Sequence, residues 1–246
     1  MCFCAYSATI IDMNFRIRIF NFCIKLDTLS DNTMRMTPKE TRNMKLGEKL
    51  VRNLARRNME AFYCPTTEAA TAKVMELMPE GSSVTWGGSM SIRDMGLTET
   101  ISASGRYEVF DRDKAAGPDE AQEIYRKAFG CDFFISSANA ISEDGEIVNI
   151  DGNGNRVAAI TFGPKNVVFV IGINKVCRDC EAAVKRARST AAPVNAARFD
   201  IETPCHTDGV CHNCNSKDCI CNFIHILRNS PKGRHKVVIV GEELGY

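Results

Sequence analysis

Apolar positions along the chain follow first a helical period and then short runs typical of strands. Near-helical spacing of Leu and Met among Lys, Arg and Glu predicts a helix over residues 38–63. A second helix is expected from Thr66 to about Met78, because Pro79-Glu80-Gly81 follows it.

From residue 83 onwards, short apolar strands alternate with helices. The strongest strand is expected over 166–173, because its continuous Val-Val-Phe-Val-Ile run is typical of a strand buried on both faces. This alternation favours a parallel sheet covered by helices, so the predicted class is α/β. The other expected strands are 83–86, 107–110, 132–136 and 146–150, and the further helices are 118–129 and 179–188.

The two ends of the chain differ from this pattern. Residues 204–222 form a loop rich in cysteine and polar residues, and strand-like runs follow at 223–227 and 236–240. A turn at 229–233 between them predicts a C-terminal hairpin. The expected domains are therefore an α/β domain at 37–203 and a cysteine-rich metal-binding segment with C-terminal strands at 204–246. Residues 1–36 are expected to be an extension outside the fold, from a misassigned start codon, with an extra docking strand as the alternative.

Composition narrows the class of protein. The chain is 44% hydrophobic and 25% charged, which are ordinary globular values, and its net charge of +1 gives no reason to expect nucleic acid or membrane as a partner. The basic stretches at 52–57 and 185–188 lie in helical patterns and are interpreted as solvated faces. No apolar run is long enough to predict a membrane-spanning helix. A cytoplasmic protein is expected.

Cysteines supply the sharpest chemical signal. Five of the twelve fall within 205–221, where Cys211 and Cys214 form a Cys-x-x-Cys pair, with Cys205 and Cys221 on either side. Four thiolates fit tetrahedral zinc or an iron–sulfur cluster, and the choice between these two stays open. A set of free thiols or a single disulfide in a surface loop is the alternative. Further candidate residues are His206 and His212 as zinc ligands, Cys219, and a second pair, Cys177 and Cys180, whose thiols are interpreted as packing groups rather than a redox pair.

Glycine-rich segments after predicted strands are candidate ligand loops. Ligands of open α/β sheets bind beyond the carboxyl ends of the strands, where backbone N–H groups and basic side chains can hold an anion. A tight turn or a solvated loop is the alternative for each segment. The candidate binding residues are Gly87, Gly88, Ser89, Asp151, Gly152, Asn153, Gly154, Asn155, Arg156 and Lys175.

One carboxylate is a candidate for catalysis. Glu143 precedes Asp144-Gly145, and a carboxylate in a Glu-x-Gly setting can act as the nucleophile of a thioester-exchanging enzyme. Asp-Gly between Ile141 and Ile147 is also a strong hairpin-turn signal, and the turn is the favoured interpretation.

Three segments together resemble the LUD-domain lactate-utilisation proteins, and more narrowly the stand-alone clostridial-type members with a C-terminal cysteine motif. These segments are SSVTWGGSMSIRDMGL, ISEDGEIVNIDGNGNRVAAITFGPKNVVFVIGINK and TPCHTDGVCHNCNSKDCICN with VVIVGEELGY, and the resemblance covers about residues 37–246. It implies a three-layer fold like that of the sugar isomerases and CoA transferases, with helices on both faces of the sheet. It also implies a part in oxidising lactate or a related organic acid, alongside iron–sulfur partner proteins. Cys205, Cys211, Cys214 and Cys221 match its cysteine motif, whereas Cys219 stands where a basic residue is common.

Three functions compete at this point, and whether the chain is an enzyme by itself stays open. The favoured hypothesis is a redox-pathway component that binds a small anionic metabolite or cofactor and a Cys-ligated metal centre. The second is a CoA-transferase-like or isomerase-like enzyme that uses Glu143, which requires Glu143 to lie in the pocket. The third is a non-catalytic binding or regulatory module stapled by zinc.

Overall fold

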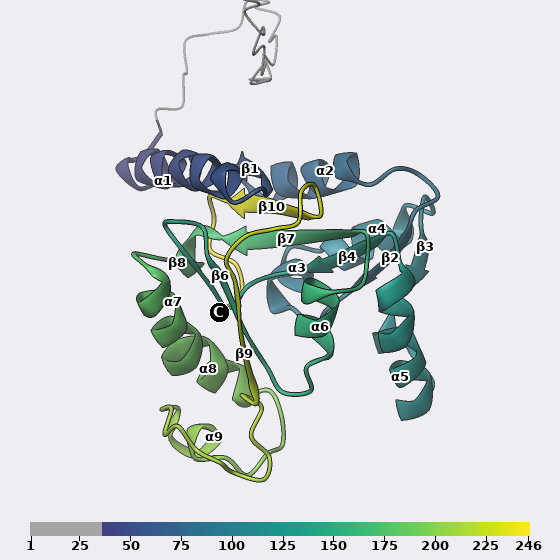
Figure 1. Ribbon diagram of the computed structural model, residues 1–246, viewed down its shortest axis with the longest axis vertical. Helices are drawn as coiled ribbons and strands as arrows, with labels where there is room; N and C mark the ends of the chain where they lie inside the picture. Colours follow the sequence, from purple (N-terminus) through teal and green to yellow (C-terminus); the bar gives the residue numbers. More distant parts are fainter. Residues whose placement is uncertain (1–35) are drawn as a thin grey trace, which may run out of the picture. The chain divides into compact units, whose positions relative to one another are not determined.

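A computed structural model describes residues 36–246, and the strands of this part of the chain form two sheets (Figure 1). The expected extension at 1–36 lies outside the described residues except for Met36. The strands are β1 (Glu60–Cys64), β2 (Ser83–Trp86), β3 (Glu108–Phe110), β4 (Phe133–Ser136), β5 (Ala140–Ser142), β6 (Ile147–Asp151), β7 (Asn166–Gly172), β8 (Val176–Cys177), β9 (Phe223–Leu227) and β10 (His235–Val240). The α-helices are α1 (Pro38–Arg56), α2 (Thr67–Leu77), α3 (Met90–Asp94), α4 (Leu97–Ala103), α5 (Pro118–Lys127), α6 (Asn155–Thr161), α7 (Cys180–Arg186), α8 (Ala192–Ala196) and α9 (Pro204–Asp208).

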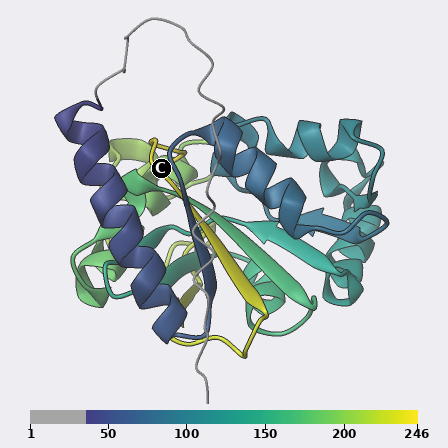
Figure 2. The same cartoon turned by 90° about the horizontal axis from the view of Figure 1, so that it is seen from above.

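The larger sheet has six strands in the order β1-β10-β7-β4-β2-β3, and every neighbouring pair is parallel. Figure 2, seen from above, shows β1, β10 and β7 side by side. Strand β7 is buried from Val167 to Gly172, as its continuous apolar run predicts. The predicted α/β class is confirmed.

Each face of this sheet has its own core. On one face, Phe169 and Ile171 of β7 pack with Leu50 and Leu54 of α1 and with Ile160 of α6. The same core includes Ile141, Ile147 and Leu227 of the smaller sheet. On the other face, alternate residues of β7 and β10 pack against α2, α3 and α4, through buried side chains such as Val74, Ile92 and Leu97. Helices therefore cover both faces, as the three-layer expectation requires.

The smaller sheet has the order β8-β5-β6-β9, with β5 parallel to β8 and antiparallel to β6. Its far face is covered by α7, α8 and the π-helical turn Ala187–Ala191 between them, where Ala140, Val148 and Ala183 form a third core.

Two predicted elements were wrong. The helix expected over 38–63 ends at Arg56, because Asn58 adopts a left-handed conformation (φ 59°) and reverses the chain into β1. The C-terminal hairpin does not form either, since β9 pairs with β6 while β10 lies between β1 and β7. Strand β10 is apolar on both faces, so it is suited to the centre of a covered sheet.

The short Asp-Gly turn between β5 and β6 is confirmed, with Gly145 at φ 91°. In the part of the chain that is described, no helix has the length and apolarity needed to span a membrane.

Candidate functional site

A cavity of about 470 Å³ opens at the carboxyl ends of the main-sheet strands. Its floor is formed by residues that follow β2, β3, β4 and β7, which is where parallel α/β sheets bind ligands. The volume lies within the range of small-molecule sites, about 300–1,000 Å³. These floor residues are Gly88, Ser89, Met90 and Ser91, then Arg112, then Ser137, Ala138 and Asn139, then Lys175.

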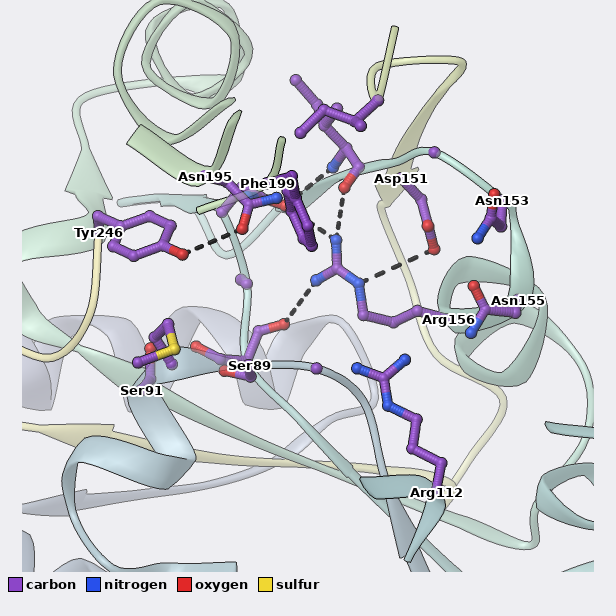
Figure 3. A pocket seen from close by; sticks show the side chains of 18 of the residues that line it. Ser89, Ser91, Arg112, Asp151, Asn153, Asn155, Arg156, Asn195, Phe199 and Tyr246 are labelled. Carbon is purple, nitrogen blue, oxygen red and sulfur yellow. Dashed lines mark hydrogen bonds and ion pairs between the residues drawn. The ribbon is translucent and has the colours of Figure 1, made fainter. Parts of the chain in front are cut away.

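The opposite wall comes from the β6–α6 loop, from the segment after α8 and from the C-terminal part of the chain (Figure 3). Asp151 ends β6, Gly152 and Asn153 belong to the loop, Asn155 begins α6, and Ile220 belongs to the cysteine-rich segment. Tyr246 donates a hydrogen bond to Asn195 (3.0 Å) across this wall.

The structure brings together all the predicted binding residues except Gly87 and Gly154. A side chain on Gly87 would lie 3.1 Å from the Cδ atom of Arg156, so Gly87 lets that arginine pass beneath the loop. Gly154 has φ 78° and packs against the ring of Phe223. Both glycines therefore lie outside the cavity lining and leave room for the side chains of neighbouring residues.

Arg156 directs its two Nη atoms at acceptors of the protein rather than at a ligand. Its Nη1 atom donates to Asn149 Oδ1 (3.0 Å), and its Nη2 atom donates to Asn139 Oδ1 (3.2 Å) and to the carbonyl of Ile150. Its Nε atom lies 3.9 Å from Asp151 Oδ2. Burial lowers the pKa of Arg156, with Asp151 opposing the shift. The guanidinium thus fixes the cavity wall rather than reaching into the cavity.

Arg112 also lines the cavity, and the sequence patterns did not identify it. Its Nε atom is buried without a hydrogen-bond partner, and Asp113 Oδ1, 3.7 Å away, belongs to a carboxylate already paired with Arg93. Its Nη1 atom donates to the hydroxyl of Tyr125. Its Nη2 atom lies only 2.1 Å from where a Cβ on Gly88 would stand. Its position just after the strand predicted at 107–110 was the feature of the sequence that could have identified it.

Lys175 lies at the floor of the cavity and is 3% exposed. Its Nζ atom donates to Ser91 Oγ (2.7 Å), Ala138 O (3.1 Å) and Ser137 Oγ (3.3 Å), so three uncharged oxygens surround it. Burial, followed by the charges of Arg186 and Arg156, lowers the pKa of Lys175 to about 7.

Glu143 lies away from the cavity. It follows β5 at the hairpin turn, where its carboxylate pairs with Lys49 (2.5 Å) and its side chain is 32% exposed. It is not among the residues that line the cavity, so the arrangement required by the transferase hypothesis is absent.

The cysteine-rich loop surrounds a second, smaller cavity of about 180 Å³, lined by Cys205, Cys211, Cys214, Cys219 and Cys221, together with His212. Burial and the neighbouring thiols of Cys219, Cys205 and Cys211 raise the pKa of Cys221 to about 12. His206 and the pair Cys177 and Cys180 do not line this cavity. Within residues 36–246, no three Cys, His, Asp or Glu side chains are arranged so that they could hold a metal as they stand. Five soft thiol donors around one small cavity nevertheless fit zinc or an iron–sulfur cluster in their chemistry.

A family profile described as the LUD domain matches residues 47–240, which is most of the chain. The chain belongs to the LUD-domain family. Membership supports a protein of the lactate-utilisation type.

Solved structures resemble this chain at low identity. A DUF162 family protein from Deinococcus radiodurans has 11% identity and a TM-score of 0.47, with 84% of this chain and 99% of that chain covered. The translation initiation factor eIF-2B of Pyrococcus horikoshii OT3 has 15% identity, a TM-score of 0.31 and coverages of 56% and 65%. The eIF2B delta structure from Chaetomium thermophilum has 11% identity and a TM-score of 0.33, with 57% of each chain covered. No curated protein matches the sequence.

Proposed function

We propose that this LUD-domain protein is a component of lactate or related organic-acid oxidation that binds a small carboxylate in the large cavity. Arg112 is the residue that carries the proposal, because its guanidinium lines the cavity and its Nη2 atom, next to Gly88, donates to no residue of the described chain. A hydrogen bond from a guanidinium to a carboxylate is charge-assisted and therefore stronger than one between neutral groups.

The size and the lining of the cavity agree with this choice of ligand. Ser89, Asn153 and Asn155 line the same cavity and add neutral hydrogen-bonding groups (Figure 3). Asp151 forms an ion pair with Arg156, so the guanidinium compensates its negative charge within the cavity wall.

Calorimetric titration of the full-length chain with lactate and with pyruvate tests the proposal. Arg112→Gln should weaken binding by roughly 10- to 100-fold, because a hydrogen bond to a charged group contributes about 1.5–3 kcal/mol. Arg106→Gln is the matched control, since Arg106 is exposed and lies over the ring of Tyr107 outside the cavity. Equal binding by the Arg112 and Arg106 variants would refute the role of Arg112, and the absence of any binding to the unchanged protein would refute the proposal.

The metal centre is the second part of the proposal, with Cys205, Cys211, Cys214 and Cys221 as ligands. The support is the gathering of these thiols around one cavity. An iron–sulfur cluster there would supply electron transfer to partner redox proteins, whereas zinc would supply structural cross-linking. A reducing cytoplasmic compartment belongs to the same proposal, because it keeps clustered thiols from forming disulfides.

Metal and sulfide analysis of the full-length chain, purified without oxygen, distinguishes these cases. Matched iron and sulfide with broad visible absorbance indicate a cluster, and a colourless protein with zinc indicates a structural site. Cys214→Ser should lower the metal content, while Cys180→Ser should leave it unchanged, since Cys180 lies outside the thiol-lined cavity. Equal metal content in both variants would count against the assigned ligands.

A further inference from the structure

Lys175 is unusual among the lysines described because its amino group is buried at the floor of a ligand-sized cavity. The three oxygens around Nζ belong to two serine hydroxyls and one backbone carbonyl, none of which carries a charge. Asp94 acts on Lys175 only as a more distant charge, since no carboxylate in residues 36–246 forms an ion pair with its Nζ atom.

This environment favours the neutral amine. A buried ammonium loses its hydration, and the guanidinium groups of Arg186 and Arg156 add repulsion, which together lower the pKa of Lys175 to about 7. A substantial fraction of the side chain is therefore an unprotonated nucleophile at neutral pH. Buried lysines of this kind serve as general bases and as imine-forming residues.

We propose that the Lys175 amine forms an imine with the carbonyl group of a 2-oxo acid whose carboxylate is held by Arg112. The inference rests on the proposed function, because it requires a small carboxylate in the same cavity. A 2-oxo acid is the product expected when a 2-hydroxy acid such as lactate is oxidised, so the ligand belongs to the same reaction class.

The step balances without an external oxidant or reductant. The Nζ lone pair attacks the carbonyl carbon, a C–N bond forms, and the carbonyl π electrons move onto oxygen. The two protons of the neutral amine reach that oxygen through the adjacent hydroxyls of Ser91 and Ser137. The oxygen then leaves as water while the C=N bond forms.

Reductive trapping tests the imine directly. The full-length chain is incubated with pyruvate and cyanoborohydride, and intact mass and peptide mapping locate the reduced adduct. We expect one stable adduct on Lys175 in the unchanged protein, and none when lactate, which has no carbonyl group at that carbon, replaces pyruvate. Lys175→Arg retains a cation but cannot form the imine, so it should abolish the adduct. Lys165→Met is the control, because Lys165 is exposed and pairs with Asp132 outside the cavity.

Calorimetry on the same samples separates this inference from the proposed function. Pyruvate binding without an adduct on Lys175 would overturn the imine while leaving the carboxylate site in place. Adducts spread over surface lysines at equal yield would also overturn it. Loss of both binding and adduct would overturn the proposed function together with the imine. Arg112→Gln should reduce the yield of adduct on Lys175 by roughly 10-fold or more at limiting pyruvate, in line with its loss of a charged hydrogen bond.

Discussion

Replacing Arg156 with Met tests whether the two arginines of the cavity have different roles, Arg156 in stability and Arg112 in ligand binding. Met keeps most of the length of the aliphatic stem but removes the guanidinium, so Asn139 Oδ1 keeps only the backbone N–H of Ile150 (2.9 Å) and three acceptors lose a donor. These are Asn149 Oδ1, Asn139 Oδ1 and the carbonyl of Ile150. The β6–α6 loop would then lose the cross-link that holds it against the loop after β4.

The expected loss follows from the burial of this group. Removing one partner of a buried charged network costs about 3–5 kcal/mol, because the remaining polar groups stay desolvated. For a domain of this size, each kcal/mol shifts Tm by roughly 2–4 °C. Arg156→Met should therefore lower Tm by about 6–20 °C. Arg112→Gln should change it by less than about 4 °C, since Arg112 contributes a buried Nε without a partner.

Urea unfolding and thermal unfolding of both variants measure their stability. Calorimetric titration with pyruvate measures their affinity for the ligand. The expected pattern is that Arg156→Met loses stability and Arg112→Gln loses affinity. If Arg156→Met kept the stability of the unchanged protein but lost pyruvate binding, the assignment of Arg156 to the wall would be refuted, and the ligand-binding role that the sequence suggests would be the correct one.

Three further predictions follow from individual contacts. Gly88→Ala should weaken carboxylate binding but leave Tm nearly unchanged, because the added methyl group displaces the flexible end of Arg112; calorimetry and thermal unfolding check this pair of results. Burial lowers the pKa of His235 from 6.5 to about 4, so the unfolded state takes up the proton first, and the free energy of unfolding should fall as pH drops from 6.5 towards 4. His235→Gln should flatten that slope in urea titrations, and an unchanged slope would show that another group is responsible. If the proposed metal is bound, removing it with a chelator should weaken pyruvate binding, because Ile220 lines both cavities, and equal affinity before and after removal would show that the two sites are independent.

Local patterns predicted the fold class because β7 is apolar on both faces, which only a covered sheet satisfies. They did not predict β1, because its run Glu-Ala-Phe-Tyr-Cys continues the apolar spacing of α1, and the break depends on the backbone of Asn58 alone. They also joined β9 to β10 as neighbours, although the partners of these strands are distant in sequence. Strand pairing over such separations leaves no local signal.

The residues of the candidate site could likewise be predicted only in part. Residues at the carboxyl ends of strands could be predicted, since strand ends are visible in the pattern and parallel strands bring them to one edge. The role of Arg156 could not, because its acceptors Asn139 and Asn149 come from the loop after β4 and from β6. Arg112 lies between two aspartates, so the sequence does not indicate whether its guanidinium is paired, and the ion pair of Asp113 with Arg93 is visible only in the structure. Whether a charged side chain is free depends on contacts that the sequence does not contain.

The cysteine-rich loop and the large cavity are in direct contact. The Cα atom of Ile220 lies only 3.3 Å from where a Cβ on Gly152 would stand, so the two backbones touch without a side chain between them. Asn222 closes the same contact by donating from Nδ2 to the carbonyl of Gly152 (3.0 Å). Ile220 stands between Cys219 and Cys221, and therefore any change in the geometry of those thiols moves a residue that lines the cavity. A ligand bound to Arg112 and a group bound by the thiols would then influence each other through a single layer of backbone, and the reciprocity of linked equilibria requires the effect in both directions.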